Sequence, residues 1–123
     1  MKVLLSIKPE FAEKIFDGVK KYEYRRSIFK KGNIEKIIVY ASAPVSKVIG
    51  EFEFDNIIYE DLKVLWNNTK QHSGISQDYF FEYFSEKEKG YAIQIKNFNK
   101  YEEPLCIKEK FGVTPPQSFV YVS

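Results

Sequence analysis

The residues from Val48 to Asp55 alternate between apolar and polar, and this alternation limits the possible folds more than any other feature of the chain. One set of alternate side chains is expected to face inward: Val48, Gly50, Phe52 and Phe54. The set between them is mostly acidic and is expected to face the other way. Because successive side chains of a strand point to opposite faces of a sheet, the pattern predicts a strand with one covered face.

Strand and helix patterns follow this segment and precede it without regular alternation. Strands are expected at residues 3–7, 22–27, 34–43, 91–95, 103–107 and 118–122. Helices are expected from Pro9 to a stop at Gly18, near 62–69 and near 79–84, with a single turn at 108–111. The helices near 62–69 and 79–84 form an insert between strands. This order predicts an α+β fold around a mixed or antiparallel sheet that can close into a barrel. At 123 residues, residues 1–123 are expected to form a single domain.

Positive charge is concentrated in the stretch Gly18–Lys31, which holds six basic residues and one acid. The rest of the chain carries 13 basic and 16 acidic side chains, so the excess is local. A concentrated positive charge attracts anions, and nucleic acid is the commonest large anion in a cell. Lys21, Lys30 and Lys31 are interpreted as sources of this electrostatic attraction.

Several kinds of site are not visible in the sequence. The chain has one cysteine, Cys106, in an apolar run, and one histidine, His72, in a polar run. We therefore expect no disulfide, no metal centre and no bound cofactor. No stretch approaches the roughly 20 apolar residues that cross a bilayer, and the N-terminus is interpreted as a strand, so a cytoplasmic location without membrane contact is predicted.

Other candidate features have simpler interpretations. The acidic residues of 51–55 are interpreted as a solubilising face, although one carboxylate among them could face a cleft. The aromatic stripe of the second insert helix has helical spacing and is expected in the core: Tyr79, Phe80, Tyr83 and Phe84. Three rings in or near the basic stretch could stack on nucleic-acid bases, but each alone is interpreted as core: Tyr22, Phe29 and Tyr40.

The basic stretch also contains an ordered polar motif, Gly18-x-Lys20-x-x-Glu23-x-Arg25. Glu23 and Arg25 share one face of the expected strand and can pair there. A lysine held beside an arginine and away from water has a lowered pKa, which makes it a usable base or nucleophile. The alternative is an exposed salt-bridge ladder worth about 0–1 kcal/mol per pair. The spacing alone leaves both interpretations open.

Several segments in order resemble a known family. They are the Ser6-Ile7-x-Pro9 segment, the following helix, the G-x-K-x-x-E-x-R motif, Tyr40-Ala41-Ser42 and the Val48–Phe54 strand. Together they resemble an ASCH domain, which belongs to the PUA-like superfamily, and the resemblance covers nearly the whole chain.

The resemblance implies a β-barrel core with surrounding helices, a polar cleft and an RNA-related function. It implies that Lys20, Glu23 and Arg25 line the cleft and bind the ligand, which would be RNA, a nucleotide or a modified nucleoside. The neighbours expected to complete the ligand-binding site are Ser6, Pro9, Arg26 and Ser42.

Some ASCH proteins are amidohydrolases that remove the acetyl group from acetylated cytidine. The resemblance implies that the lysine matching Lys20 is catalytic in that subgroup, where a threonine nucleophile stands at the position of Glu23. A carboxylate does not replace a hydroxyl nucleophile, but Glu23 could act as a general base on water while Lys20 or Arg25 stabilises the oxyanion.

Three functional hypotheses follow. The first is a small RNA- or nucleotide-binding domain whose polar cleft is formed by the motif. The second is a hydrolase that acts on a modified nucleoside or on RNA, with Lys20 and Glu23 as catalytic residues. The third is a protein-interaction domain whose basic strip meets an acidic partner.

Overall fold

The computed structural model describes all residues, 1–123, as eleven elements. The six strands are β1 (Lys2–Ile7), β2 (Tyr22–Arg25), β3 (Lys36–Ala41), β4 (Lys47–Asp61), β5 (Lys89–Leu105) and β6 (Phe119–Val122). The helices are α1 (Pro9–Phe16), α2 (Leu62–Thr69), the short 3-10 helix η1 (Lys70–His72), α3 (Gln77–Tyr83) and α4 (Ile107–Phe111). The predicted insert of two helices is present between β4 and β5.

All six strands form one sheet in the order β2-β5-β4-β3-β1-β6. β1 and β3 are parallel, and every other neighbouring pair is antiparallel. The mixed sheet and the α+β class agree with the sequence-based prediction. The edge strands β2 and β6 are not paired with each other, so the sheet is not closed and the predicted barrel is not confirmed.

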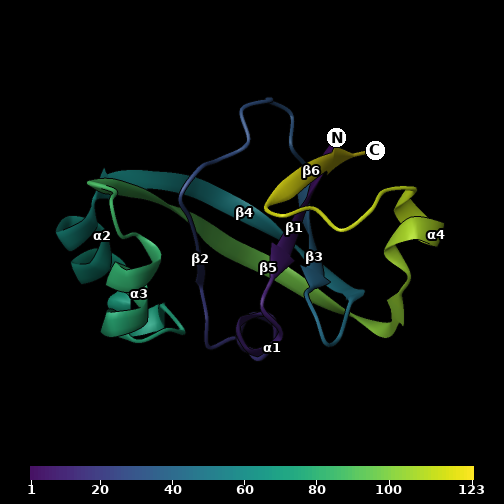
Figure 1. Cartoon of the computed structure of the whole chain (residues 1–123), viewed down its shortest axis with the longest axis horizontal. Coiled ribbons are helices and arrows are strands. Elements are labelled where there is room, and N and C mark those ends of the chain that lie inside the picture. The colour runs from purple at the N-terminus through teal and green to yellow at the C-terminus, as the bar shows by residue number, and fades with distance from the viewer.

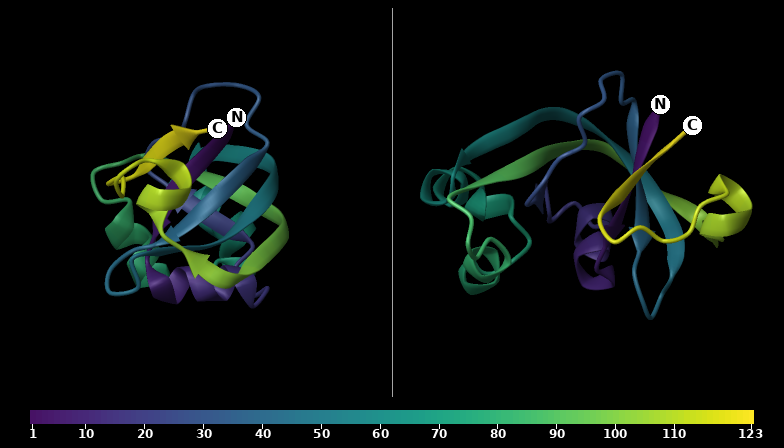
Figure 2. Two further views of the ribbon diagram at one scale, coloured as in Figure 1. Left: turned by 90° about the vertical axis from the view of Figure 1, so that its right-hand side faces the viewer. Right: turned by 45° about the horizontal axis from the view of Figure 1, so that its top comes forward.

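The long ribbon of β4 and β5 organises the molecule (Figures 1 and 2). Helices α2 and α3 lie at one end of this ribbon, α4 lies at the other, and α1 lies between them. The two chain termini are close together because β1 and β6 are antiparallel neighbours. Both ribbon strands extend well beyond the predicted 48–55 and 91–95, since their outer parts are exposed and carry no apolar alternation.

The alternation of β4 is interrupted near its start. The register against β5 shifts between Val48 and Gly50. As a result Ile49, predicted to face away from the core, is 6% exposed and packs in the same cluster as Phe52. Val48 packs in a separate cluster, which includes Ile107 of α4. The bulge therefore lets one strand serve both faces of the sheet.

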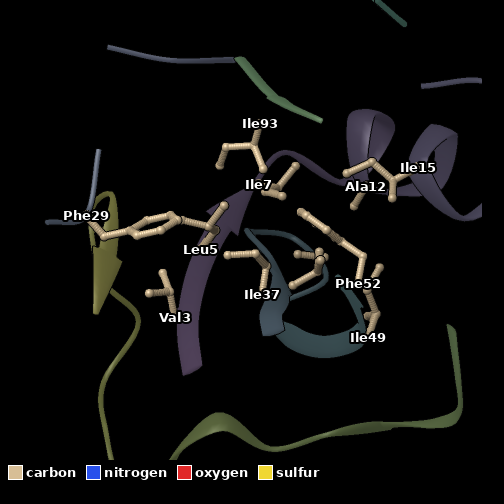
Figure 3. Packing of buried hydrophobic residues seen from close by; sticks show 12 residues of the cluster. Val3, Leu5, Ile7, Ala12, Ile15, Phe29, Ile37, Ile49, Phe52 and Ile93 are labelled. Carbon is tan, nitrogen blue, oxygen red and sulfur yellow. The ribbon is translucent and has the colours of Figure 1, made fainter. Parts of the chain in front are cut away.

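The main core lies between the sheet and α1 (Figure 3). Twelve buried residues form it, and Ala12 and Ile15 of α1 pack there against side chains of β1, β3 and β4. Phe29, from the loop after β2, closes one side of this cluster. Pro9 begins α1, where its missing N–H has no helical partner to lose, as predicted.

A separate cluster attaches the insert to the sheet. Tyr24 of β2 and Ala92 of β5 pack against the buried face of α2 and α3, which contributes Leu65, Trp66, Phe80 and Phe84. The Tyr24 hydroxyl donates to the Thr69 hydroxyl at 2.7 Å, and Thr69 donates in turn to a backbone carbonyl of α2. This cluster fixes the insert beside β2, and a cleft lies where the two meet.

Candidate functional site

A cleft of about 880 Å³ lies along the side of β2 that faces away from β5, which we term the open edge. Its volume lies within the range of roughly 300–1,000 Å³ found for small-molecule sites. Residues from several parts of the chain line it: the end of β1, α1, the turn before β2, β2 itself, the end of β3 with the turn after it, the insert and the segment 115–118. All three charged residues of the motif, Lys20, Glu23 and Arg25, are among them.

These three residues are buried, with exposed fractions of 2%, 6% and 8%. The alternative of an exposed salt-bridge ladder is therefore wrong for this motif. Burial of charged groups requires specific partners, and the geometry of each side chain shows what those partners are.

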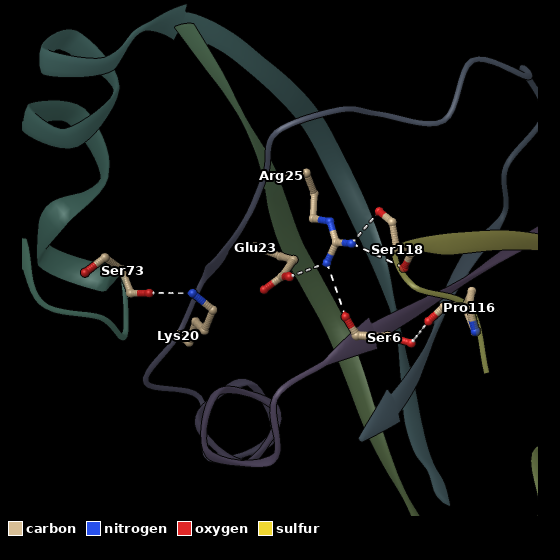
Figure 4. Close-up of polar contacts among 7 residues, drawn as sticks. All are labelled: Ser6, Lys20, Glu23, Arg25, Ser73, Pro116 and Ser118. Atoms are coloured by element: carbon tan, nitrogen blue, oxygen red, sulfur yellow. Dashed lines mark hydrogen bonds and ion pairs between the residues drawn. The ribbon is translucent and has the colours of Figure 1, made fainter. Parts of the chain in front are cut away.

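The Arg25 side chain links β2, at one edge of the sheet, to β1 and to the residue before β6 near the other edge (Figure 4). Its Nη1 donates to Glu23 Oε2 at 3.1 Å and to the backbone oxygen of Ser6 at 3.3 Å. Its Nη2 donates to the backbone oxygen and the hydroxyl of Ser118, at 3.2 and 2.8 Å. Ser6 lies in β1 and Ser118 immediately precedes β6. The guanidinium thus connects strands that no backbone ladder joins.

Lys20 approaches the cleft from the turn between α1 and β2. Its Nζ donates to the backbone oxygen of Ser73 at 2.7 Å and lies 4.9 Å from the ring centre of Tyr24. Burial lowers the pKa of the Lys20 ammonium to about 8, although the nearby Glu23 carboxylate opposes this and Lys14 adds to it. A substantial neutral fraction is therefore present at mildly alkaline pH.

Glu23 provides the cleft with an acceptor. Arg25 occupies its Oε2, while Oε1 has no hydrogen-bond partner in the protein. A buried carboxylate paired with a guanidinium on one oxygen presents its other oxygen to a ligand that can donate. The cleft thus holds a strong acceptor beside the donor of Lys20.

Aromatic rings and cations complete the cleft. Its aromatic lining comprises Phe11, Tyr24, Tyr40, Tyr79 and Tyr83. The prediction that the whole stripe of α3 belongs to the core is correct for Phe80 and Phe84, but Tyr79 and Tyr83 are half-buried and line the cleft. Burial raises the pKa of the Tyr83 hydroxyl, with Arg25 opposing this effect.

Some of the other expected site residues line the cleft and some do not. Ser6, Arg26 and Ser42 line it, whereas Pro9 does not and instead begins α1. The exposed residues Lys21, Lys30 and Lys31 also lie outside the lining. The exposed cations that do line the cleft are Lys8, Arg26 and Lys87.

Sequence reasoning missed Ser73 and Ser118, which hold Lys20 and Arg25 in place. Ser73 contributes only its backbone oxygen to Lys20, so residue type carries no signal there. The neighbouring Gly74 is the residue whose type matters for this contact. A Cβ at this position would lie 2.7 Å from the Lys20 Cβ, and its φ of +69° also favours glycine.

His, Cys, Asp and Glu side chains gather nowhere in groups of three or more that could hold a metal ion. No helix has the length and apolar character needed to cross a membrane.

Comparisons with known proteins identify relatives that match almost the whole chain. No protein-family model matches it. It is 29% identical over 121 residues to the ATP synthase subunit alpha of Ureaplasma parvum, but it spans only 15% of that protein's length. It is 28% identical over 123 residues to the ASCH domain-containing ribonuclease of Zymomonas mobilis, of which it spans 82%.

The fold matches a crystal structure from the same source. The ASCH protein of Zymomonas mobilis superposes with a TM-score of 0.90 and 29% identity, over 99% of this chain and 87% of that one. The match extends across the sheet and the helices that surround the cleft.

Proposed function

The chain has an ASCH domain, and from this premise we propose that it binds RNA in the cleft lined by Lys20, Glu23 and Arg25. The observation that carries the proposal is that one cleft contains the Lys20 ammonium as a donor, the unpaired oxygen of the Glu23 carboxylate as an acceptor, and several tyrosine rings. Exposed cations at the cleft can hold phosphates while the rings stack on bases. The Zymomonas mobilis relative named as a ribonuclease supports an RNA-related role.

The three motif residues have different roles in this proposal. Lys20 and the free oxygen of Glu23 contact the ligand. Arg25 does not, because its guanidinium is engaged by Glu23, Ser6 and Ser118. Arg25 instead pairs with the Glu23 carboxylate and fixes the shape of the cleft.

Fluorescence anisotropy with a labelled single-stranded RNA tests the proposal. Lys20→Ala is expected to weaken binding at least tenfold, and the affinity of the unmodified protein should fall steeply with added salt because neutralised phosphates release counterions. Lys110→Ala is the matched control, since it removes the same charge from exposed α4, at the opposite end of the β4–β5 ribbon from α2 and α3. Equal effects of the two substitutions would refute the cleft assignment.

One observation also favours a hydrolytic activity. The lowered pKa of Lys20 gives an amine that can accept a proton from an attacking hydroxyl or water near pH 8. The substrates to test are single-stranded RNA and acylated cytidine, with products separated by chromatography. Turnover should rise as pH increases through about 8 and disappear in Lys20→Ala and Glu23→Gln. No turnover that depends on these residues would exclude the activity.

A further inference from the structure

The open edge of β2 carries unpaired backbone groups inside the cleft. β2 pairs with β5 alone, in the register Glu23 to Ile93, Tyr24 to Ala92 and Arg25 to Tyr91. The amide of Ile95 donates to the Lys21 oxygen at 2.9 Å, which makes residue 21 one of the hydrogen-bonded positions of this ladder.

The alternation of antiparallel pairing then determines the direction of the neighbouring groups. The Lys21 oxygen and both main-chain groups of residues 23 and 25 therefore point toward β5, whereas the Lys21 amide donates to the His72 oxygen of the insert at 2.8 Å. By the same alternation, residues 22 and 24 direct their N–H and C=O groups away from β5. β2 has no strand neighbour on that side, and the Tyr24 backbone takes part in none of the backbone hydrogen bonds formed outside the helices and strand ladders. Since Tyr24 lines the cleft and Tyr22 does not, one donor and one acceptor of the main chain are available there.

Two side-chain bridges limit the length of this edge. At one end Lys20 donates to the Ser73 oxygen, and at the other Arg25 donates to the Ser6 and Ser118 oxygens (Figure 4). A peptide that added itself as a further strand would have to pass through both bridges. A compact planar group, such as a single base, can reach the Tyr24 backbone without crossing either bridge.

We propose that the Tyr24 backbone N–H and C=O read the hydrogen-bonding edge of one unstacked nucleobase, with Lys20 and Glu23 Oε1 beside them. The inference rests on the proposed RNA-binding function and names the group that the cleft would take. Every nucleobase has an adjacent donor and acceptor on one edge, which is what a single residue of an unpaired strand complements. Nearby tyrosine rings supply stacking surfaces for that base.

Amide hydrogen exchange measured by NMR tests the inference, with the four ribonucleoside 5′-monophosphates as probes. In the free protein the Tyr24 amide should exchange at least tenfold faster than the amides of Glu23 and Arg25, which are bonded to β5. A bound nucleotide should slow the Tyr24 amide at least tenfold and leave its two neighbours unchanged.

A backbone substitution supplies the matched control. Replacement of Tyr24 by its α-hydroxy acid analogue converts the amide N–H to an ester oxygen and keeps the side chain. Nucleotide binding should weaken about fivefold, the value of one neutral hydrogen bond. The same replacement at Tyr22 alters the same strand at a residue outside the cleft lining and should have no effect.

The outcomes separate the two proposals. If a nucleotide shifts the resonances of cleft residues but leaves Tyr24 exchange unchanged, the inference is wrong and RNA binding in the cleft stands. If neither nucleotides nor single-stranded RNA bind, both are wrong. Protection of Tyr24 by a capped extended tetrapeptide, and not by any nucleotide, would also overturn the inference.

Discussion

Arg25→Ala is expected to destabilise the domain strongly, because this side chain bridges the two sides of an open sheet. The substitution removes four hydrogen bonds and leaves the carboxylate of the buried Glu23 without its positive partner. Removal of one partner from a buried ion pair typically costs about 3–5 kcal/mol. The Ser118 hydroxyl loses its partner as well, whereas the Ser118 backbone oxygen keeps the bond from the Ser6 amide at 3.1 Å. We therefore expect a loss of about 4 kcal/mol.

Urea unfolding provides the measurement. Trp66 is the only tryptophan and is 8% exposed in the cluster that joins the insert to β2, so its fluorescence reports on the region next to Arg25. The double substitution Glu23→Gln with Arg25→Met should recover part of the lost stability, since it removes the unpaired charge. Lys100→Ala, which breaks an exposed pair with Glu13, should leave the midpoint almost unchanged.

A loss below about 1 kcal/mol for Arg25→Ala would refute this reasoning, because an exposed pair gives a value of that size. Equal losses in the single and the double variants would also contradict it. That result would mean that the unpaired carboxylate contributes nothing to the destabilisation.

Three further predictions concern backbone space and Lys20. Gly50→Ala should destabilise the protein by about 1–3 kcal/mol in urea unfolding, because its Cβ would lie 2.4 Å from the Phe16 ring; an unchanged midpoint would contradict the packing of α1 on β4. Gly74→Ala should displace Lys20 and raise its pKa from about 8 toward 10.5, which the pH dependence of Lys20 acetylation measures. An unaltered pH dependence would mean that the loop at Gly74 does not position the Lys20 amine. The pKa of Lys20 is lower in the folded protein than in the unfolded chain, so the unfolded chain binds more protons between pH 8 and 10.5. The free energy of unfolding should therefore rise, relative to that of Lys20→Met, as pH increases through this interval. A difference in unfolding free energy that stays constant with pH would refute the lowered pKa.

Part of the fold could be predicted from local patterns. The alternation in β4 and the stripe in α1 reflect burial on one side, and such burial leaves a periodic signal in the sequence. The extent of β4 and β5 could not be predicted, because their exposed outer halves are held by pairing with each other and not by a covered face. The bulge at Val48 was also invisible, since it arises from the register against β5.

For the candidate site, the sequence determined which charged residues lie together. Lys20, Glu23 and Arg25 are at most five positions apart, and their spacing on a turn and a strand brings them to one place. Only the tertiary structure decided their roles. Arg25 lies 93 positions from Ser118 and Lys20 lies 53 from Ser73, and the partners of a buried charge are determined by which distant segments fold against it. The unpaired edge at Tyr24 has the same origin, because only the order of strands in the sheet leaves β2 with a single neighbour.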